Sequence, residues 1–380
     1  MMKKTRIYLD YNASAPLRPC ANAAMQQALG DDAEAALNAS SVHYFGREGK
    51  KRLETAREQV ASLVGAPPSQ VIFNSGATEG NNTVIQHFSR TYPQKRLLVS
   101  SIEHPSILQA APQLEQIPVR SDGMIDLQAF EKMMTSGNEV SLVSVMTVNN
   151  ETGAIQNVSE ISSIARKHGA FMHTDAVQAA GRIPLNLSER GIDFLTLSSH
   201  KIGGPQGVGA LILGLCGETP KLLYGGGQEK SARAGTENIL GIIGFGEAAK
   251  ESLERMNHYQ ALVKWRDRLE NEILQITPTA IIHAKDVNRV ANTSFFSTPG
   301  LSSETLLMAL DLEGVAVSNG SACSSGRVEP SHVLKAMGMD DKIASSALRV
   351  SLGWATKESD IDAFIAAWKK VTARIAKKEN

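Results

Sequence analysis

Short apolar runs alternate with longer amphipathic stretches along most of the chain. Strands are predicted at 71–73, 97–100, 140–147, 170–174, 194–198 and 209–213. Helices are predicted over 47–64, where Leu53, Ala56, Val60 and Leu63 recur at three- and four-residue spacing, and over 79–88. Strands that alternate with helices are typical of an α/β protein with a mostly parallel sheet.

The pattern changes after about residue 237. Residues 237–276 are mostly helical in pattern and would suit a long connector. Beyond them, shorter strand and helix patterns at 289–296, 303–310, 315–317, 348–352 and 358–376 predict a smaller α+β unit. We therefore expect a large domain over 17–256 and a small C-terminal domain over 257–380, which the N-terminal segment 1–16 completes.

The composition argues against several classes of binding partner and against disulfide or zinc sites. The 39 Lys and Arg residues balance 39 Asp and Glu residues, so no basic field favours nucleic acid or an anionic membrane. No apolar run approaches the roughly 18 residues that span a bilayer. Cys20, Cys216 and Cys323 form no CxxC motif, which argues against a disulfide framework and a zinc site. We expect a soluble, cytoplasmic protein without a metal, in which Cys20 and Cys216 are small buried residues.

Polar or glycine-containing segments follow several of the predicted strands. They are 103–105, 149–153, Asp175 and 199–201. In open α/β sheets, ligands bind beyond the carboxyl ends of the strands. We therefore expect these segments to form one shared site.

Lys201 and Asp175 are the first candidates for chemistry at that site. A buried lysine amine has a lowered pKa and suits a Schiff base with an aldehyde cofactor. Pyridoxal 5′-phosphate (PLP) acts as an electron sink when a carboxylate keeps its ring nitrogen protonated, a role that fits Asp175. Gln178 would share the face of Asp175 if a helix starts there, and it could donate to the ring phenolate oxygen. The alternatives are a surface lysine before a turn and an aspartate that caps a helix.

Gly76, Ala77 and Thr78 supply a candidate phosphate site. A glycine at a strand-to-helix turn lets backbone N–H groups approach a phosphate, and the helix N-terminus adds partial positive charge. Ser198 and His200 could complete the site. The alternative is a helix start that is capped and binds nothing.

Taken together, these segments resemble the cysteine desulfurases of the NifS/IscS type, within the class V aminotransferase-like PLP enzymes. The resemblance runs from Tyr8 to about Leu352. The matching segments are 8–13, 38–46 (NASSVHYFG), 75–79 (SGATE), 103–104, 149–153 (NNETG), 173–178 (HTDAVQ), 198–201 (SSHK), 225–238 and 320–323 (GSAC).

The resemblance implies the PLP fold type I, with a mostly parallel sheet of the seven-stranded type in the large domain. It also implies PLP as cofactor, L-cysteine as substrate, and a role for each matched residue. Lys201 looks like the Schiff-base lysine, and His104 like an imidazole that stacks on the ring and assists proton transfer. The implied cofactor contacts are Ala77, Thr78, His104, Asn150, Asp175, Gln178, Ser198, His200, Lys201 and Thr236. The implied substrate contacts are Asn38, Asn150 and Arg349, whose planar guanidinium suits a carboxylate. Thr236 would reach the phosphate in the neighbouring subunit, which implies a homodimer.

Cys323 distinguishes a desulfurase from the alternatives on the same fold, an aminotransferase or a selenocysteine lyase. It lies in a stretch without bulky side chains, 318–326, a composition that predicts a mobile loop. The resemblance implies that its thiolate takes the substrate sulfur as a persulfide for an acceptor protein, such as an iron–sulfur scaffold or a tRNA-thiolation relay. Without the resemblance, Cys323 would be an incidental cysteine in a turn. A nucleotide-binding module is a weaker alternative, because no GxxxxGK[ST] motif or strand-linked GxGxxG motif is present.

Overall fold

The computed structural model describes residues 6–30, 37–187, 191–214, 217–320 and 329–379. Within them, a central sheet has the strand order β2-β8-β7-β6-β5-β3-β4. Only β8 runs antiparallel to the rest of this described sheet, so the predicted mostly parallel seven-stranded sheet is confirmed. The strands are β2 (Val71–Asn74), β3 (Arg96–Ser100), β4 (Leu114–Ile117), β5 (Val140–Ser144), β6 (Phe171–Asp175), β7 (Phe194–Ser198) and β8 (Gly209–Leu213).

Side chains of the central strands are buried on both faces of the sheet. Leu98, Val143 and Leu195 contribute to one buried cluster, together with side chains of α2 and α7. Their strand neighbours Leu97 and Phe194 contribute to a second cluster, which packs on α3 and α4. Successive side chains of a strand point to opposite faces, so a sheet covered by helices on both sides needs continuous apolar strands. This explains why the strands could be found in the sequence as short apolar runs.

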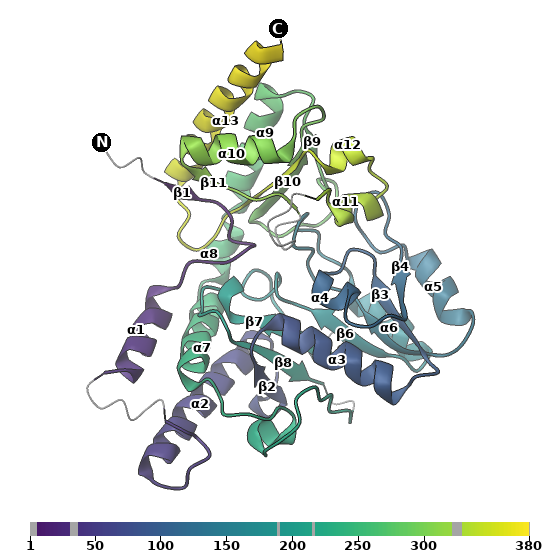
Figure 1. Cartoon of the computed structure of the whole chain (residues 1–380), viewed down its shortest axis with the longest axis vertical. Coiled ribbons are helices and arrows are strands. Elements are labelled where there is room, and N and C mark those ends of the chain that lie inside the picture. Colours follow the sequence, from purple (N-terminus) through teal and green to yellow (C-terminus); the bar gives the residue numbers. More distant parts are fainter. Residues whose placement is uncertain (1–5, 31–36, 188–190, 215–216, 321–328, 380) are drawn as a thin grey trace.

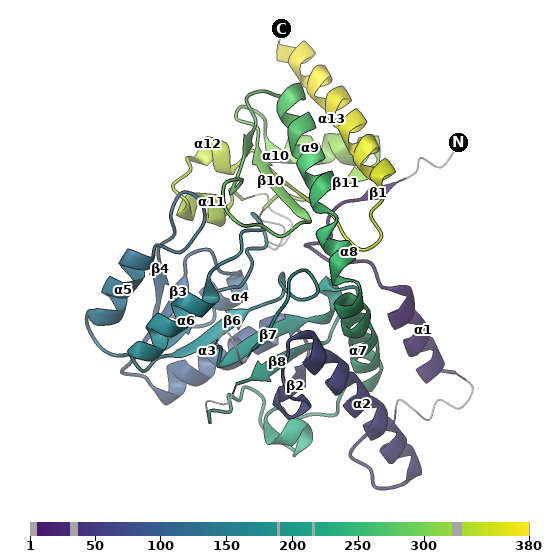
Figure 2. The same ribbon diagram turned by 180° about the vertical axis from the view of Figure 1, so that it is seen from behind.

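The helices of this part surround the sheet (Figure 1). They are α1 (Pro19–Ala28), α2 (Tyr44–Leu63), α3 (Ala77–Thr91), α4 (Pro105–Leu108), α5 (Leu127–Thr135), α6 (Val158–Lys167) and α7 (Ile239–Glu254), with 3-10 turns η2 (Pro68–Gln70), η3 (Ser199–Lys201) and η4 (Gln228–Ser231). The connector continues through α8 (Met256–Gln260) into α9 (Val263–Ile276), and Figure 2 shows these helices along one side of the molecule.

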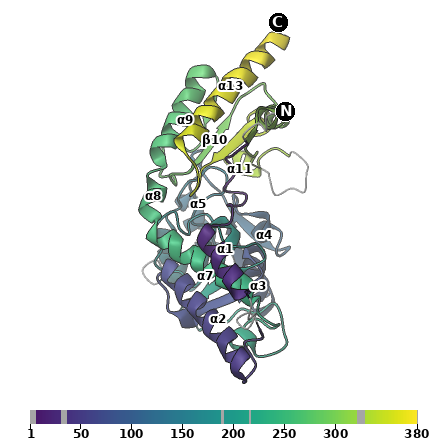
Figure 3. The ribbon, with the colours of Figure 1, turned by 90° about the vertical axis from the view of Figure 1, so that its left-hand side faces the viewer.

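A third buried cluster lies around a small antiparallel sheet, β12-β10-β9. From residue 281 onward, the elements are β9 (Ile281–Ile282), β10 (Thr293–Ser297), α10 (Ser303–Glu313), β11 (Val315–Ala316), α11 (His332–Ala336), α12 (Asp341–Ala344), β12 (Ala347–Ser351) and α13 (Glu358–Glu379). Leu9 belongs to this cluster, because the N-terminal strand β1 (Ile7–Tyr8) pairs with β11. Figure 3 shows α13 and α9 at the opposite end of the molecule from α2. The division at residue 257 stays a prediction.

One condition set from the sequence is not met, and one predicted strand is shorter than expected. No helix follows Asp175: residues 176–182 form consecutive turns, in which Val177 N donates to Asp175 Oδ1 at 3.0 Å and Gly181 has a φ of 70°. The strand predicted over 140–147 ends at Ser144, although Val145 N and Thr147 N still donate to carbonyls of β6 and its end. Among the described residues, no helix is both long and apolar enough to cross a membrane.

Candidate active site

A cavity of about 520 Å³ opens where β6 and β7 end and where α3 begins. Ten of the predicted residues line it. They are Ala77, Thr78, His104, Asn150, Asp175, Gln178, Ser198, His200, Lys201 and Arg349. The chain segment after β1 contributes Asn12, Ala13 and Ser14. The structure therefore brings together residues that are far apart in the sequence, at the carboxyl edge of the sheet where ligands bind in open α/β folds.

The N-terminus of α3 faces this cavity. Gly76 precedes the helix with a φ of 149°, a conformation that favours glycine, and a Cβ there would meet no atom within 4 Å. The open space and the unpaired N–H groups of a first helical turn suit an anion. Ser198 and His200 line the same cavity. Burial lowers the pKa of His200 to about 4, so its imidazole is neutral at pH 7 and acts as a neutral hydrogen-bonding group.

Lys201 ends the short turn η3 that follows β7. Its Nζ donates to the backbone oxygens of Asn12 at 2.7 Å and Ala13 at 2.9 Å. β7 is buried along its whole length, so the strand fixes the point from which the lysine side chain enters the cavity. A primary amine is thereby held between the sheet edge and the N-terminal segment.

Asp175 is a buried carboxylate at the end of β6, 7% exposed. Its Oδ1 accepts from Val177 N, and its Oδ2 accepts from Asn81 Nδ2 at 2.8 Å. These two donors fix the orientation of the carboxyl group at the end of the strand. Gln178 reaches the cavity from the turns after Asp175, and its Nε2 donates to Asn12 O at 3.0 Å.

His104 caps the short helix α4. Its Nδ1 accepts from Ser106 N at 3.1 Å and lies 2.8 Å from Ser106 Oγ. Because Nδ1 is an acceptor, the neutral ring carries its proton on Nε2. Burial lowers the pKa of His104, although the charge of Asp175 acts in the opposite direction. The imidazole is therefore neutral at pH 7.

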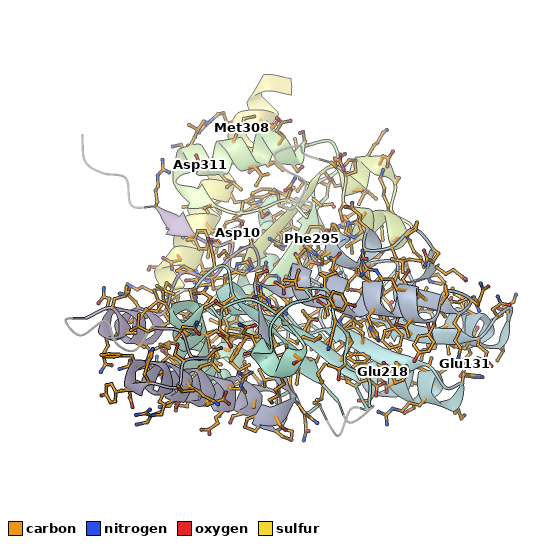
Figure 4. All side chains as sticks on the ribbon, turned by 60° about the horizontal axis from the view of Figure 1, so that its bottom comes forward. Asp10, Glu131, Glu218, Phe295, Met308 and Asp311 are labelled. Carbon is orange, nitrogen blue, oxygen red and sulfur yellow. The ribbon has the colours of Figure 1, made fainter. Side chains whose placement is uncertain are left out.

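Arg349 enters the cavity from β12 and is 2% exposed. Its Nη1 donates to Asn150 O and its Nη2 to Asp10 Oδ1, both at 2.9 Å. Figure 4 labels Asp10, in the region between the central sheet and the smaller one. Among the described residues, Arg349 Nε and Asn150 Oδ1 have no hydrogen-bond partner although both are buried. Unpaired buried polar atoms of this kind indicate a place for a polar ligand.

Two predicted residues that the structure describes do not line the cavity. Asn38 and Thr236 are exposed, and Asn38 Oδ1 accepts from Ser40 N at 2.9 Å. Cys323 lies outside the described residues, as does Cys216. Cys20 is partly exposed rather than fully buried, and burial is the main cause that raises its pKa to about 12.

Residues on either side of the segment that contains Cys323 contact one buried carboxyl group. Ser331 Oγ donates to Glu151 Oε2, and a Cβ added at Gly320 would lie 2.2 Å from the same oxygen. Burial raises the pKa of Glu151, which is 1% exposed. Glu151 follows Asn150 of the cavity, so both described ends of this segment lie near the site.

Sequence reasoning missed three residues of this network. Asn81 binds Asp175, Ser106 binds His104, and Asn12 accepts from Lys201. Asn81 lies on α3 one turn after Thr78, so the helical spacing could have placed it near the cavity. Asn12 lies in the matching segment 8–13, but that match assigned it no role, and its partners lie far away in the sequence.

The donor set fits PLP. The start of α3 with Thr78 can hold the phosphate, Asp175 can pair with the ring nitrogen, and Lys201 supplies the amine for the aldehyde. Gln178 Oε1 is a further buried atom without a partner among the described residues. An α/β fold with these groups at one sheet edge defines the class of PLP-dependent enzymes of fold type I.

The chain belongs to the aminotransferase class-V family, whose model matches residues 7–364. It is 37% identical to "Cysteine desulfurase IscS" of Dictyoglomus turgidum, over 98% of this chain and 96% of the relative. It is 40% identical to "Cysteine desulfurase" of a Nostoc species, over 97% and 93%. Among solved structures, a NifS-like protein from Rickettsia africae superposes with a TM-score of 0.89 at 35% identity, over 97% of this chain and 99% of the other.

Proposed function

We propose that this chain is a PLP-dependent cysteine desulfurase that converts L-cysteine to L-alanine and passes the sulfur to Cys323. The observation that carries this proposal is the meeting of Lys201, Asp175 and the start of α3 in one cavity that also holds Arg349. The relatives that are called cysteine desulfurases cover nearly the whole chain, which supports the same activity here.

Substrate binding would depend on Arg349. Its buried guanidinium would hold the carboxylate of L-cysteine, because its Nε is a donor that has no partner among the described residues. Asp10 and Asn150 O already hold the two Nη atoms and so fix the plane of the guanidinium. The orientation of the substrate is thereby set before chemistry begins.

PLP, when bound, supplies an electron sink that weakens the bonds at the substrate Cα. Asp175 would keep the ring nitrogen protonated, and Asn81 holds Asp175 in place. Lys201 Nζ would take the proton from Cα, as a general base. His104, neutral with its proton on Nε2, would hold or deliver a proton on the face of the cavity where it lies.

The sulfur transfer would need Cys323. Its thiolate would attack the substrate sulfur, so that an S–S bond forms as the Cβ–S bond breaks and the electron pair stays on the carbon fragment. Protonation of that fragment gives alanine. Gly320 and Ser331, which the structure describes before and after Cys323 in the chain, lie against Glu151, beside Asn150 of the cavity, and this supports the proposed role of Cys323.

Two variants test the proposal. Lys201→Ala should abolish the visible absorbance of the protein with PLP, and Cys323→Ala should keep that absorbance but form no alanine from L-cysteine. Alanine formation that survives unchanged in Cys323→Ala would contradict the desulfurase. Assays with L-selenocysteine, and with an amino acid plus a 2-oxo acid, distinguish the selenocysteine lyase and the aminotransferase.

Further parts of the proposal concern assembly. Thr236 is exposed and does not line its own chain's cavity, which supports a homodimer in which it reaches the partner's phosphate site. Mixing Lys201→Ala chains with Thr236→Ala chains should then restore activity. In such a mixed dimer, one of the two sites combines the intact Lys201 of one chain with the intact Thr236 of the other.

We also propose a two-domain chain divided near 257 and a cytoplasmic location, where Cys323 stays reduced. The acceptor would be a protein thiol on an iron–sulfur scaffold or a tRNA-thiolation relay.

A further inference from the structure

The turn that follows β1 holds the amine of Lys201. The backbone oxygen of Asn12 accepts from Lys201 Nζ at 2.7 Å and also from Gln178 Nε2 at 3.0 Å. Ala13 O accepts from the same amine at 2.9 Å. A single carbonyl group, that of Asn12, therefore fixes both a lysine and a glutamine that line the cavity.

The side chain of Asn12 fixes that carbonyl group in turn. Its Nδ2 donates to Asn150 O at 3.1 Å and to Thr293 Oγ1 at 3.0 Å. Its Oδ1 accepts from Arg182 Nη1 at 2.8 Å and from Asn292 Nδ2 at 3.1 Å. These four bonds use the two donors and two acceptor sites of the amide, and the residue is 1% exposed.

Arg182 is the charged member of this network. It is 2% exposed, its Nη1 donates to Asn12, and its guanidinium lies 5.9 Å from the centre of the Tyr259 ring. Its Nη2 has no partner among the described residues. A hydrogen bond from a charged donor is stronger than one between neutral groups, so Arg182 is the strongest restraint on the Asn12 side chain.

We propose that Asn12 is the positioning residue for the Lys201 amine and for Gln178, and that the buried Arg182 guanidinium holds Asn12 in place. This inference rests on the proposed function, in which Lys201 binds the aldehyde of PLP and later takes a proton from the substrate. Both steps need the amine at a defined point, and a displacement of about 1 Å at a reacting group can cost on the order of a hundredfold in rate.

The test uses Asn12→Ala and Arg182→Met. Neither variant removes the backbone acceptor of Lys201, so any effect on Lys201 comes from a change in the position of that acceptor. We expect Asn12→Ala to lower kcat for L-cysteine by roughly 10- to 100-fold, with KM changed much less. The rate at which PLP added to the cofactor-free chain forms the visible band should fall in the same variant. Arg182→Met should change both rates in the same direction.

Ser297→Ala is the matched control. Ser297 is fully buried in β10 and bonds His283 and Ile343 O, both at 2.8 Å, so its loss lowers stability without touching Asn12. If Asn12→Ala and Ser297→Ala have the same kcat and form the visible band at the same rate, the inference is overturned. If Asn12→Ala does not fold, Arg182→Met provides the test. An unchanged rate of formation of the visible band in Arg182→Met would overturn the inference. A wild-type chain that forms no visible band with PLP would instead overturn the proposed function.

Discussion

Asn81 Nδ2 lies 2.8 Å from Asp175 Oδ2 and 2.9 Å from Ser106 Oγ. Ser106 in turn contacts His104 Nδ1. One amide group on α3 thus connects the carboxylate at the end of β6 with the imidazole that caps α4. In the proposed enzyme, these two side chains contact the same cofactor ring, and Asn81 would set their relative position.

Asn81→Ala should therefore weaken the retention of PLP. The lost hydrogen bond to a charged group is worth about 1.5–3 kcal/mol, which corresponds to roughly a 10- to 100-fold higher dissociation constant. The dissociation constant is measured by titrating the cofactor-free chain with PLP and monitoring the visible absorbance. Asn138→Ala, at an exposed position that bonds Gln94 O, is the control. Equal affinities in the two variants would show that Asn81 does not act through Asp175.

Gly76→Ala should weaken phosphate binding at the start of α3. The φ of 149° is strained for alanine, so the turn must move, at a cost of about 1–3 kcal/mol. Gly169→Ala is the comparison, since Gly169 also has a positive φ and open space around it but does not line the cavity. Both variants should lose stability, but only Gly76→Ala should bind PLP more weakly. If Gly76→Ala binds PLP with normal affinity, Gly76 does not contribute to phosphate binding.

Arg57→Leu should destabilise the chain by about 3–5 kcal/mol, because it leaves Glu229 as a buried charge without its partner. Arg57 Nη1 and Nη2 bond the two oxygens of Glu229 at 2.7 and 2.8 Å, and both side chains are almost fully buried. Glu229 begins three residues with left-handed backbone, so the ion pair also holds a strained turn. Urea unfolding measures the loss in the free energy of unfolding. An exposed ion pair such as Lys95–Glu139 contributes about 0–1 kcal/mol, and a loss in that range for Arg57→Leu would contradict the prediction.

Acid should destabilise the fold in part through His173. Burial lowers its pKa from the usual 6.5 to about 3, and its ring nitrogens contact Ser144 Oγ and Thr196 Oγ1. Between these two pH values the unfolded chain binds a proton that the folded chain does not bind. The free energy of unfolding therefore falls as the pH is lowered from 6.5 towards 3, by about 1.4 kcal/mol per pH unit for this residue.

His173→Gln should reduce that pH dependence, which urea unfolding at several pH values below 6.5 can measure. His258→Gln, at an exposed position of α8, is the matched control. His200 and His283, whose pKa values are lowered to about 4 by burial, contribute in the same direction, so the variant should retain part of the dependence. If the free energy of unfolding of His173→Gln changes with pH as steeply as that of His258→Gln, then His173 binds protons in the folded chain.

The sequence predicted the location of the site because strand ends can be read from apolar runs. Lys201 and Asp175 follow two neighbouring parallel strands, and parallel strands bring their carboxyl ends to one edge. The helix α6 was not among the predictions, although Val158, Ile161 and Ala165 have helical spacing and are buried.

The rest could not be read from local patterns. Asn12 bonds Gln178, Arg182 and Asn292, at separations of 166, 170 and 280 residues, and its own neighbours predict only a turn. Gln178 lies in the cavity although the helix expected after Asp175 is absent there, because a run of turns carries it to the same place. The type of residue at a strand end was thus easier to predict than the backbone path that presents it.

The pairing of β1 with β11 joins positions 7 and 315, and Asp10 bridges to Ser351. During synthesis on the ribosome, residues 7–10 emerge long before residues 315 and 351, with which they pair, and they cannot dock until those residues are made. Until then the acceptors at positions 12 and 13 are not seated beside Lys201. Capture of the cofactor in its final geometry is therefore a late event in the maturation of each newly made chain.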